Sequence, residues 1–99
     1  MIFVCSPYRG NEKKNIEFAK QCCKKVCELN QIPFAPHLYF TQFLDDSIGL
    51  ERKQGMKYGL EFMKICDEVW VFGNTISSGM KEEIEYANSI GKKVYFYGN

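Results

Sequence analysis

The sequence VFGNTISSGMKEEIEYA, residues 71–87, decides the fold of this chain. It joins the end of an apolar strand to the start of a helix through a short polar loop. Gly73 and Gly79 bracket the loop, and the hydroxyl of Ser77 or Ser78 can cap the helix. We predict that this stretch forms the floor of a small-molecule site.

Glu83 is the residue of this stretch that we consider the strongest candidate for a catalytic role. The helix is predicted to run from about Ser78 to Ile90, with Met80 and Ala87 on its inner face. This spacing turns Glu83 toward the loop rather than outward to solvent. The helix dipole alone accounts for the other acidic residues of its first half, but it accounts less well for Glu83.

Outside this stretch, strands and helices alternate along the chain. Apolar runs predict strands at residues 2–5, 32–35, 68–72 and 93–97, with the two prolines placing residues 32–35 at an edge. Three- and four-residue spacings predict helices at about 11–29, from Asp45 or Asp46 to 65, and 78–90, with Gly59 allowing close approach to the sheet. Residues 37–46 are expected to be irregular or a short helical turn.

This order predicts an α/β fold, a three-layer flavodoxin-like or Rossmann-like sandwich with a four-stranded parallel sheet of strand order 2-1-3-4. The first helix would cover one face, and the other two helices the second face. Ligands of such sheets bind at the carboxyl ends of the strands, where the strand order reverses. The loops at residues 6–10 and 73–79 meet there, and the loop from His37 opens on the same rim. The expected ligand-contacting residues are Ser6, Pro7, Tyr8, Arg9, His37, Gly73, Ser77, Ser78, Gly79 and Met80.

Three of these residues have a second interpretation. Arg9 either pairs with a phosphate or carboxylate or is a surface charge at a loop tip. Tyr8 either stacks on a ligand ring or covers the first helix. His37 either binds ligand and moves a proton or is an ordinary loop residue.

Composition limits the classes of function. The 99 residues are 45% hydrophobic and include 15% aromatic residues, which fits one domain spanning residues 1–99. A formal net charge of +1 does not indicate the excess of positive charge that binding to a nucleic-acid polymer or a membrane surface requires. Five cysteines without a secretion signal favour a reduced, cytoplasmic protein. With His37 as the single histidine, neither a metal site nor a cofactor is expected.

Several segments resemble the nucleoside 2-deoxyribosyltransferase-like proteins. Residues 78–80, 83–84, 86–87 and 91–94 resemble their active-site helix, and residues 2–8 resemble their first strand and substrate-contacting loop. The match is most specific to a branch of short, uncharacterised bacterial and phage proteins. Residues 36–38, 43–44, 51–52, 66–73 and 78–80 carry that match.

The resemblance implies a function on nucleosides or nucleotides. In the transferases, the helix glutamate attacks the anomeric carbon of a nucleoside, and Glu83 matches this nucleophile. Related members hydrolyse the N-glycosidic bond of nucleoside monophosphates with loop serines around the phosphate, a role open to Ser6, Ser77, Ser78 and Arg9. Where the transferases carry an aspartate six residues before the glutamate, this chain has Ser77, which suits a phosphate-binding loop.

Three functions follow from these observations. The first is an N-glycosidic bond hydrolase or deoxyribosyltransferase with Glu83 as nucleophile. The second is a non-catalytic module that binds or sequesters a nucleotide-derived signalling ligand in the same pocket. The third is a structural or regulatory dimer. A homodimer or larger homo-oligomer is expected in each case, with the second helix around Met56, Tyr58 and Phe62 as the contact.

Overall fold

The computed structural model describes residues 1–98, in which four parallel strands form one sheet of order β2-β1-β3-β4. The strands are β1 (Ile2–Cys5), β2 (Pro33–Phe34), β3 (Glu68–Phe72) and β4 (Lys93–Gly98). The predicted α/β class and strand order are confirmed. Within this part of the chain, no helix is both long and apolar enough to span a membrane.

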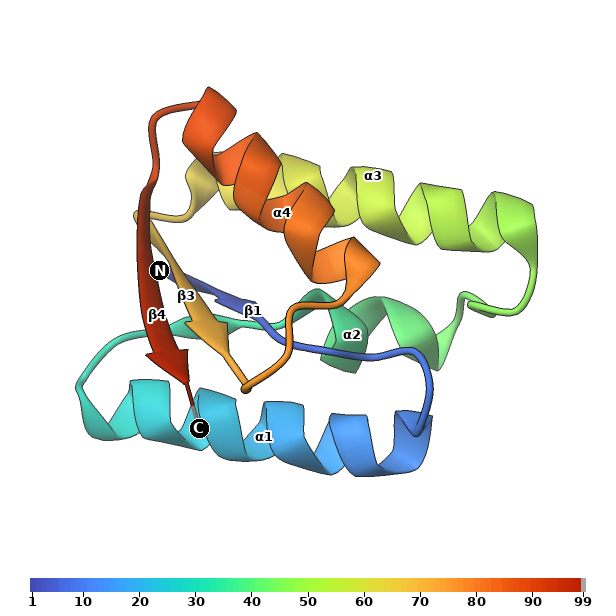
Figure 1. The fold of residues 1–99 in the computed structure, drawn as a ribbon, viewed down its shortest axis with the longest axis horizontal. Coiled ribbons are helices and arrows are strands. Elements are labelled where there is room, and N and C mark those ends of the chain that lie inside the picture. The colour runs from blue at the N-terminus through green and yellow to red at the C-terminus, as the bar shows by residue number, and fades with distance from the viewer. Residues whose placement is uncertain (99) are drawn as a thin grey trace.

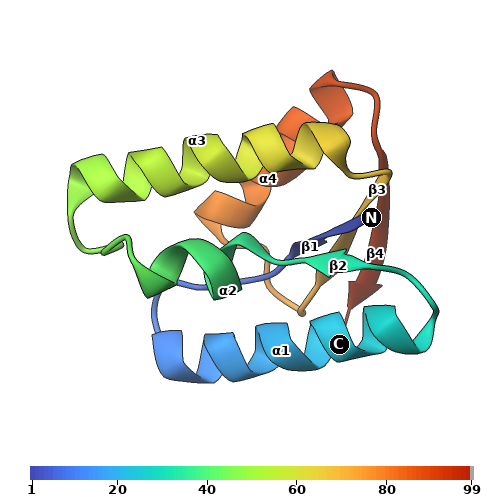
Figure 2. The same cartoon turned by 180° about the vertical axis from the view of Figure 1, so that it is seen from behind.

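The helices lie in two layers on either side of the sheet (Figure 1). Helix α1 (Glu12–Glu28) covers one face, and α3 (Gly49–Ile65) and α4 (Ser78–Ser89) cover the other. The short helix α2 (Pro36–Tyr39) follows β2 and leads into the 3-10 turn η1 (Phe40–Gln42), as Figure 2 shows from behind. The predicted helical turn in residues 37–46 is therefore present.

The central strands bury side chains on both faces of the sheet. On the α1 face, Val4 and Phe72 pack with Val26. On the opposite face, Phe3 and Val71 belong to the core that α3 and α4 complete. This two-sided burial explains why β3 shows no alternation of apolar and polar residues, since polar side chains would have no solvated face to occupy.

Residues at the helix ends act largely as the sequence predicts. The side chain of Asn11 caps α1 by accepting a hydrogen bond from the main-chain N–H of Lys14 at 3.2 Å. Asn30 has a φ of 61° and ends the same helix, and Gly91 follows α4 with a φ of 75°. Ser77 caps α4, because its Oγ accepts from the N–H of Met80 at 3.2 Å.

The start of α3 and the role of Gly59 were predicted wrongly. Helix α3 begins at Gly49 because the carboxylate of Asp45 instead accepts the main-chain N–H of Ser47 at 2.9 Å, which holds a turn before the helix. Gly59 approaches α2 rather than the sheet: a Cβ at this position would lie 3.3 Å from the Cβ of Pro36. This close contact brings α2 against α3.

An aromatic cluster fastens α3 to the sheet edge. Phe62 stacks on Phe34 of β2, with ring centroids 4.2 Å apart, and Phe40 of η1 packs against both rings. Phe62 is thus engaged within the chain, whereas Tyr58 keeps an exposed face. Of the predicted oligomer-contact residues, Tyr58 is the one that is exposed.

Candidate functional site

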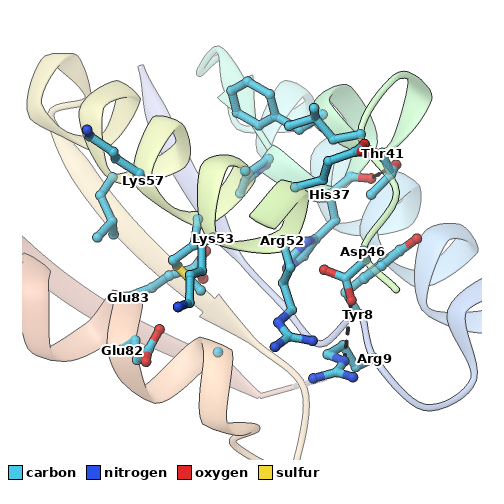
Figure 3. Close-up of a pocket in the computed structure, with 18 of the residues that line it drawn as sticks. Tyr8, Arg9, His37, Thr41, Asp46, Arg52, Lys53, Lys57, Glu82 and Glu83 are labelled. Atoms are coloured by element: carbon cyan, nitrogen blue, oxygen red, sulfur yellow. Dashed lines mark hydrogen bonds and ion pairs between the residues drawn. The ribbon is translucent and has the colours of Figure 1, made fainter. Parts of the chain in front are cut away.

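A cavity of about 670 Å³ lies between α3, α4 and the segment from α2 to η1 (Figure 3). The loop after β1 forms one end, and the N-terminus of α4 forms part of the floor. Seven predicted site residues line this cavity: Tyr8, Arg9, His37, Ser77, Ser78, Gly79 and Glu83. Loops that follow β1, β2 and β3 therefore come together at the carboxyl ends of the strands, as the strand order requires.

Four predicted site residues lie outside the cavity lining. Met80 is buried in the core between the sheet and α4, so it does not line the cavity. Ser6 is also fully buried. Gly73 faces Pro7 and Phe18 on the α1 side, where a Cβ would lie 3.6 Å from the Cδ of Pro7. Sequence patterns placed these residues in the correct segments of the chain but did not determine which way each side chain points.

Glu83 is the buried acid of the cavity. Its side chain is 2% exposed, and its Oε1 has no hydrogen-bond partner within the described residues. Burial raises the pKa of Glu83 to about 8, the neighbouring Cys5 thiol opposes this rise, and the Glu82 carboxylate adds to it. Glu83 therefore carries a proton at neutral pH in the free protein.

Cys5, the last residue of β1, is a neighbour of this acid, and Ser6 follows it in sequence. The Cys5 Sγ lies 3.8 Å from the main-chain oxygen of Met80, and burial raises the pKa of its thiol. The Ser6 Oγ is the second buried oxygen without a partner in residues 1–98. An unsatisfied buried oxygen costs free energy, so the one that Glu83 brings to the cavity indicates a place where a bound group can complete the hydrogen bonding.

Tyr8 and His37 form a stacked pair, with ring centroids 4.9 Å apart and an interplanar angle of 16°. Burial lowers the pKa of His37 to about 4, although Asp46 and a hydrogen bond with the main chain of Ser6 act in the opposite direction. His37 is thus neutral at pH 7, and an imidazolium is not available there to protonate a leaving group. The Tyr8 ring is covered by His37 on one face.

Arg9 lies at the exposed rim and pairs with Asp46, the Nε to Oδ2 distance being 3.3 Å.

Sequence reasoning missed the wall opposite α4, which α3 supplies through Arg52, Lys53, Lys57, Met56 and Leu60. A signal was present, because Arg52 lies four residues before Met56 and eight before Leu60. Arg52 therefore lies on the same face of the helix as Met56 and Leu60.

Gly73→Ala is expected to destabilise the fold by about 1–2 kcal/mol, because Gly73 has a φ of 108°, where an L side chain is strained. Gly49→Ala is the matched control, since Gly49 has open space around it and no positive φ. Urea unfolding measures both. Equal stabilities of the two variants would contradict this account of the loop.

Ser77→Ala is expected to cost about 1 kcal/mol through loss of the α4 cap, whereas Ser77→Asp should keep most of the stability because aspartate also caps helices. The free energy of unfolding of each variant in urea is the measurement. If both substitutions destabilised the protein equally, capping would not be what Ser77 contributes.

Within residues 1–98, no three histidine, cysteine, aspartate or glutamate side chains gather as a metal site. All five cysteines are free thiols, three of them buried.

Comparison with known proteins identifies a matching family and a solved structure with a similar fold. Residues 1–97 match the family model described as "Domain of unknown function (DUF7768)". No curated protein matches the sequence. Among solved structures, the chain is similar to a 2-deoxyribosyltransferase from Bacillus psychrosaccharolyticus, with a TM-score of 0.73 and 21% sequence identity. The similarity covers 98% of this chain and 71% of the other, and it shows a shared fold.

Proposed function

The chain belongs to the DUF7768 family, and we propose that this member binds a nucleoside or nucleotide and cleaves its N-glycosidic bond. The observation that carries the proposal is Glu83. It is a carboxyl group buried at the floor of a cavity, with one oxygen unpartnered in the described residues. The fold shared with a 2-deoxyribosyltransferase, described as a biocatalyst for nucleoside synthesis, supports the choice of substrate class.

The proposed reaction begins with an ionised Glu83. A carboxylate oxygen forms a bond to the anomeric carbon while the carbon–nitrogen bond breaks, and the electron pair leaves on the base. The base takes up a proton from water, and Glu83 becomes a glycosyl ester. Water then cleaves this ester in a hydrolase, or a second base takes the sugar in a transferase.

Cavity electrostatics set a pH requirement for this reaction. The pKa of about 8 means that little of the Glu83 carboxylate is ionised in the free protein at pH 7. A nucleophilic role therefore requires kcat/KM to rise with pH toward a limit above about pH 8. Neutral His37 can accept a proton, but with a pKa of about 4 it carries no proton to donate as an imidazolium at pH 7.

A second candidate is a non-catalytic module that holds a nucleotide-derived ligand. The observation that favours it is the protonated state of Glu83 together with the neutral state of His37, which at pH 7 supply neither a carboxylate nucleophile nor an imidazolium to protonate the leaving base. Such a module would bind its ligand stoichiometrically and release it unchanged.

The remaining features of the proposal concern the whole molecule. Residues 1–99 form one nucleoside 2-deoxyribosyltransferase-like domain of the short bacterial and phage branch. It acts in the cytoplasm as a homo-oligomer, without a cofactor. Incubation with a panel of nucleosides and nucleotides, followed by chromatography for free base, tests the enzyme against the binding module.

A further inference from the structure

The acidic side chains that line the cavity beside Glu83 differ in what they contact. They are Asp46, Glu51, Glu61 and Glu82. Asp46 pairs with Arg9, its Oδ2 lying 3.3 Å from the Nε. The Glu51 carboxylate accepts the main-chain N–H of Asp45 at 2.8 Å. Both oxygens of Glu61 bind the Nζ of Lys64, at 3.0 and 3.1 Å. Three of these carboxylates are therefore engaged within the chain.

Glu82 is the exception. Within residues 1–98, no side-chain hydrogen bond or ion pair involves its carboxylate. Its side chain is exposed, and it directly precedes Glu83 on α4. Figure 3 shows the two side chains at neighbouring positions of the helix, on the side that faces the cavity. The oxygens of Glu82 can therefore accept hydrogen bonds from bound water.

The helix dipole does not explain this placement. It favours an acid anywhere in the first half of α4, so it does not distinguish Glu82 from Glu85. Glu85 is also exposed, but it does not line the cavity. The charge of Glu82 is close enough to Glu83 to raise the pKa of that acid. Position beside the proposed nucleophile therefore separates Glu82 from the other exposed acid of this helix half.

Cleavage of a glycosyl ester needs a group that takes a proton from the attacking water. Water is a weak nucleophile, and a positioned carboxylate makes it more reactive. In glycosidases that form a covalent intermediate, one carboxylate is the nucleophile and a second carboxylate nearby removes this proton. Glu83 cannot do so itself, because in the ester one of its oxygens carries the sugar and the other is a carbonyl oxygen.

His37 is the other group of the cavity that could accept a proton, but it lies elsewhere. Its ring stacks on Tyr8, with centroids 4.9 Å apart. Figure 3 places this pair and Asp46 at the end of the cavity away from Glu83. A water that attacks a sugar held by Glu83 is therefore closer to the carboxylate of Glu82 than to the imidazole.

We propose that Glu82 is the general base of the second step, so that water is the acceptor and this chain is a hydrolase. The inference rests on the proposed function for the glycosyl ester of Glu83. The water oxygen bonds to the anomeric carbon while Glu82 takes one of its protons. The bond from that carbon to Glu83 breaks, and its electron pair returns to the carboxylate. Because Glu82 is exposed, it passes its proton to solvent, which replaces the proton that the leaving base took from water.

Base release over the first and later turnovers tests the inference, with the four 2′-deoxynucleosides and their 5′-monophosphates as probes. The assay is run at about pH 8.5, above the pKa of about 8 that burial gives Glu83. Glu82→Gln should release one equivalent of base within about threefold of the parental rate, and then turn over about 100-fold more slowly or less. Its intact mass should show one bound sugar.

Azide provides a second signature, because it is an anion that attacks without losing a proton. It should restore turnover of Glu82→Gln, with a glycosyl azide as the product, and leave the parental rate unchanged. Glu85→Gln is the matched control and should behave as the parent does in every assay. Melting temperatures establish that each variant is folded, and Glu82→Ala should repeat the azide signature.

Three results would overturn the inference: parental turnover in Glu82→Gln, equal slowing of its first and later turnovers, or a slow variant that carries no sugar and gains nothing from azide. If Glu83→Gln is inactive while Glu82→Gln matches Glu85→Gln, only the role of Glu82 fails. If Glu83→Gln still releases base, the nucleophile of the proposed function fails, and with it the ester on which Glu82 would act. If the parent releases no base from any probe, both proposals fail.

Discussion

Glu83→Gln is expected to lower the rate of base release at least about a thousandfold while leaving ligand affinity within a few-fold of the parent. Glutamine keeps the shape and the hydrogen-bonding atoms of the protonated acid, but it cannot become the carboxylate that attacks the anomeric carbon. The effect should therefore fall on kcat, with little change in binding. Chromatographic assay of free base, combined with calorimetric titration, measures the two quantities separately.

Glu85→Gln is the matched control for this substitution. Glu85 lies two residues further along α4, is exposed and does not line the cavity, so its variant should release base at the parental rate. A Glu83→Gln protein that released base as fast as Glu85→Gln would exclude Glu83 as the nucleophile.

Glu83→Gln should also stabilise the protein increasingly as pH rises from about 4.5 to about 8. In this window the folded parent keeps the Glu83 proton, since burial raises the pKa to about 8, whereas the unfolded chain has lost it. The folded state therefore binds more protons, and parental stability falls with pH by up to about 1.4 kcal/mol per pH unit from this group. Glutamine carries no such proton.

The measurement is the free energy of unfolding in urea at pH 5, 6.5 and 8 for the parent, Glu83→Gln and Glu85→Gln. Titration of His37 and of the other carboxylates is common to all three proteins and cancels in the differences. The advantage of Glu83→Gln should grow by about 4 kcal/mol across the window, and that of Glu85→Gln should stay nearly constant. A pH-independent advantage for Glu83→Gln would mean that the buried carboxyl is not protonated as described.

Much of this fold could be predicted because local patterns and packing agree. The unbroken apolar run of β3 is that of a strand covered on both faces, and it lies between β1 and β4. The inward position of Glu83 followed from its spacing to Met80 and Ala87 on one helix. Both inferences depended on the fixed periodicity of a single element, which a sequence displays directly.

The incorrect and missing predictions involve contacts between elements. Asp45 was expected to open a helix, but its carboxylate binds the nearby main chain of Ser47 and delays the start of α3. Gly59 was assigned to the sheet, although its close neighbour is Pro36 of α2. Arg52 was overlooked because it reaches the cavity only through the packing of α3 opposite α4, which no local pattern of the sequence displays.

The central claim is that this cavity breaks an N-glycosidic bond, and the most direct test is base release by the parent protein across pH 6 to 9. The substrates are the 2′-deoxynucleosides and their 5′-monophosphates, with free base quantified by chromatography. The account predicts release from at least one substrate, at a rate that rises with pH and levels off above about pH 8. Ligands bound stoichiometrically and recovered intact at every pH would contradict it.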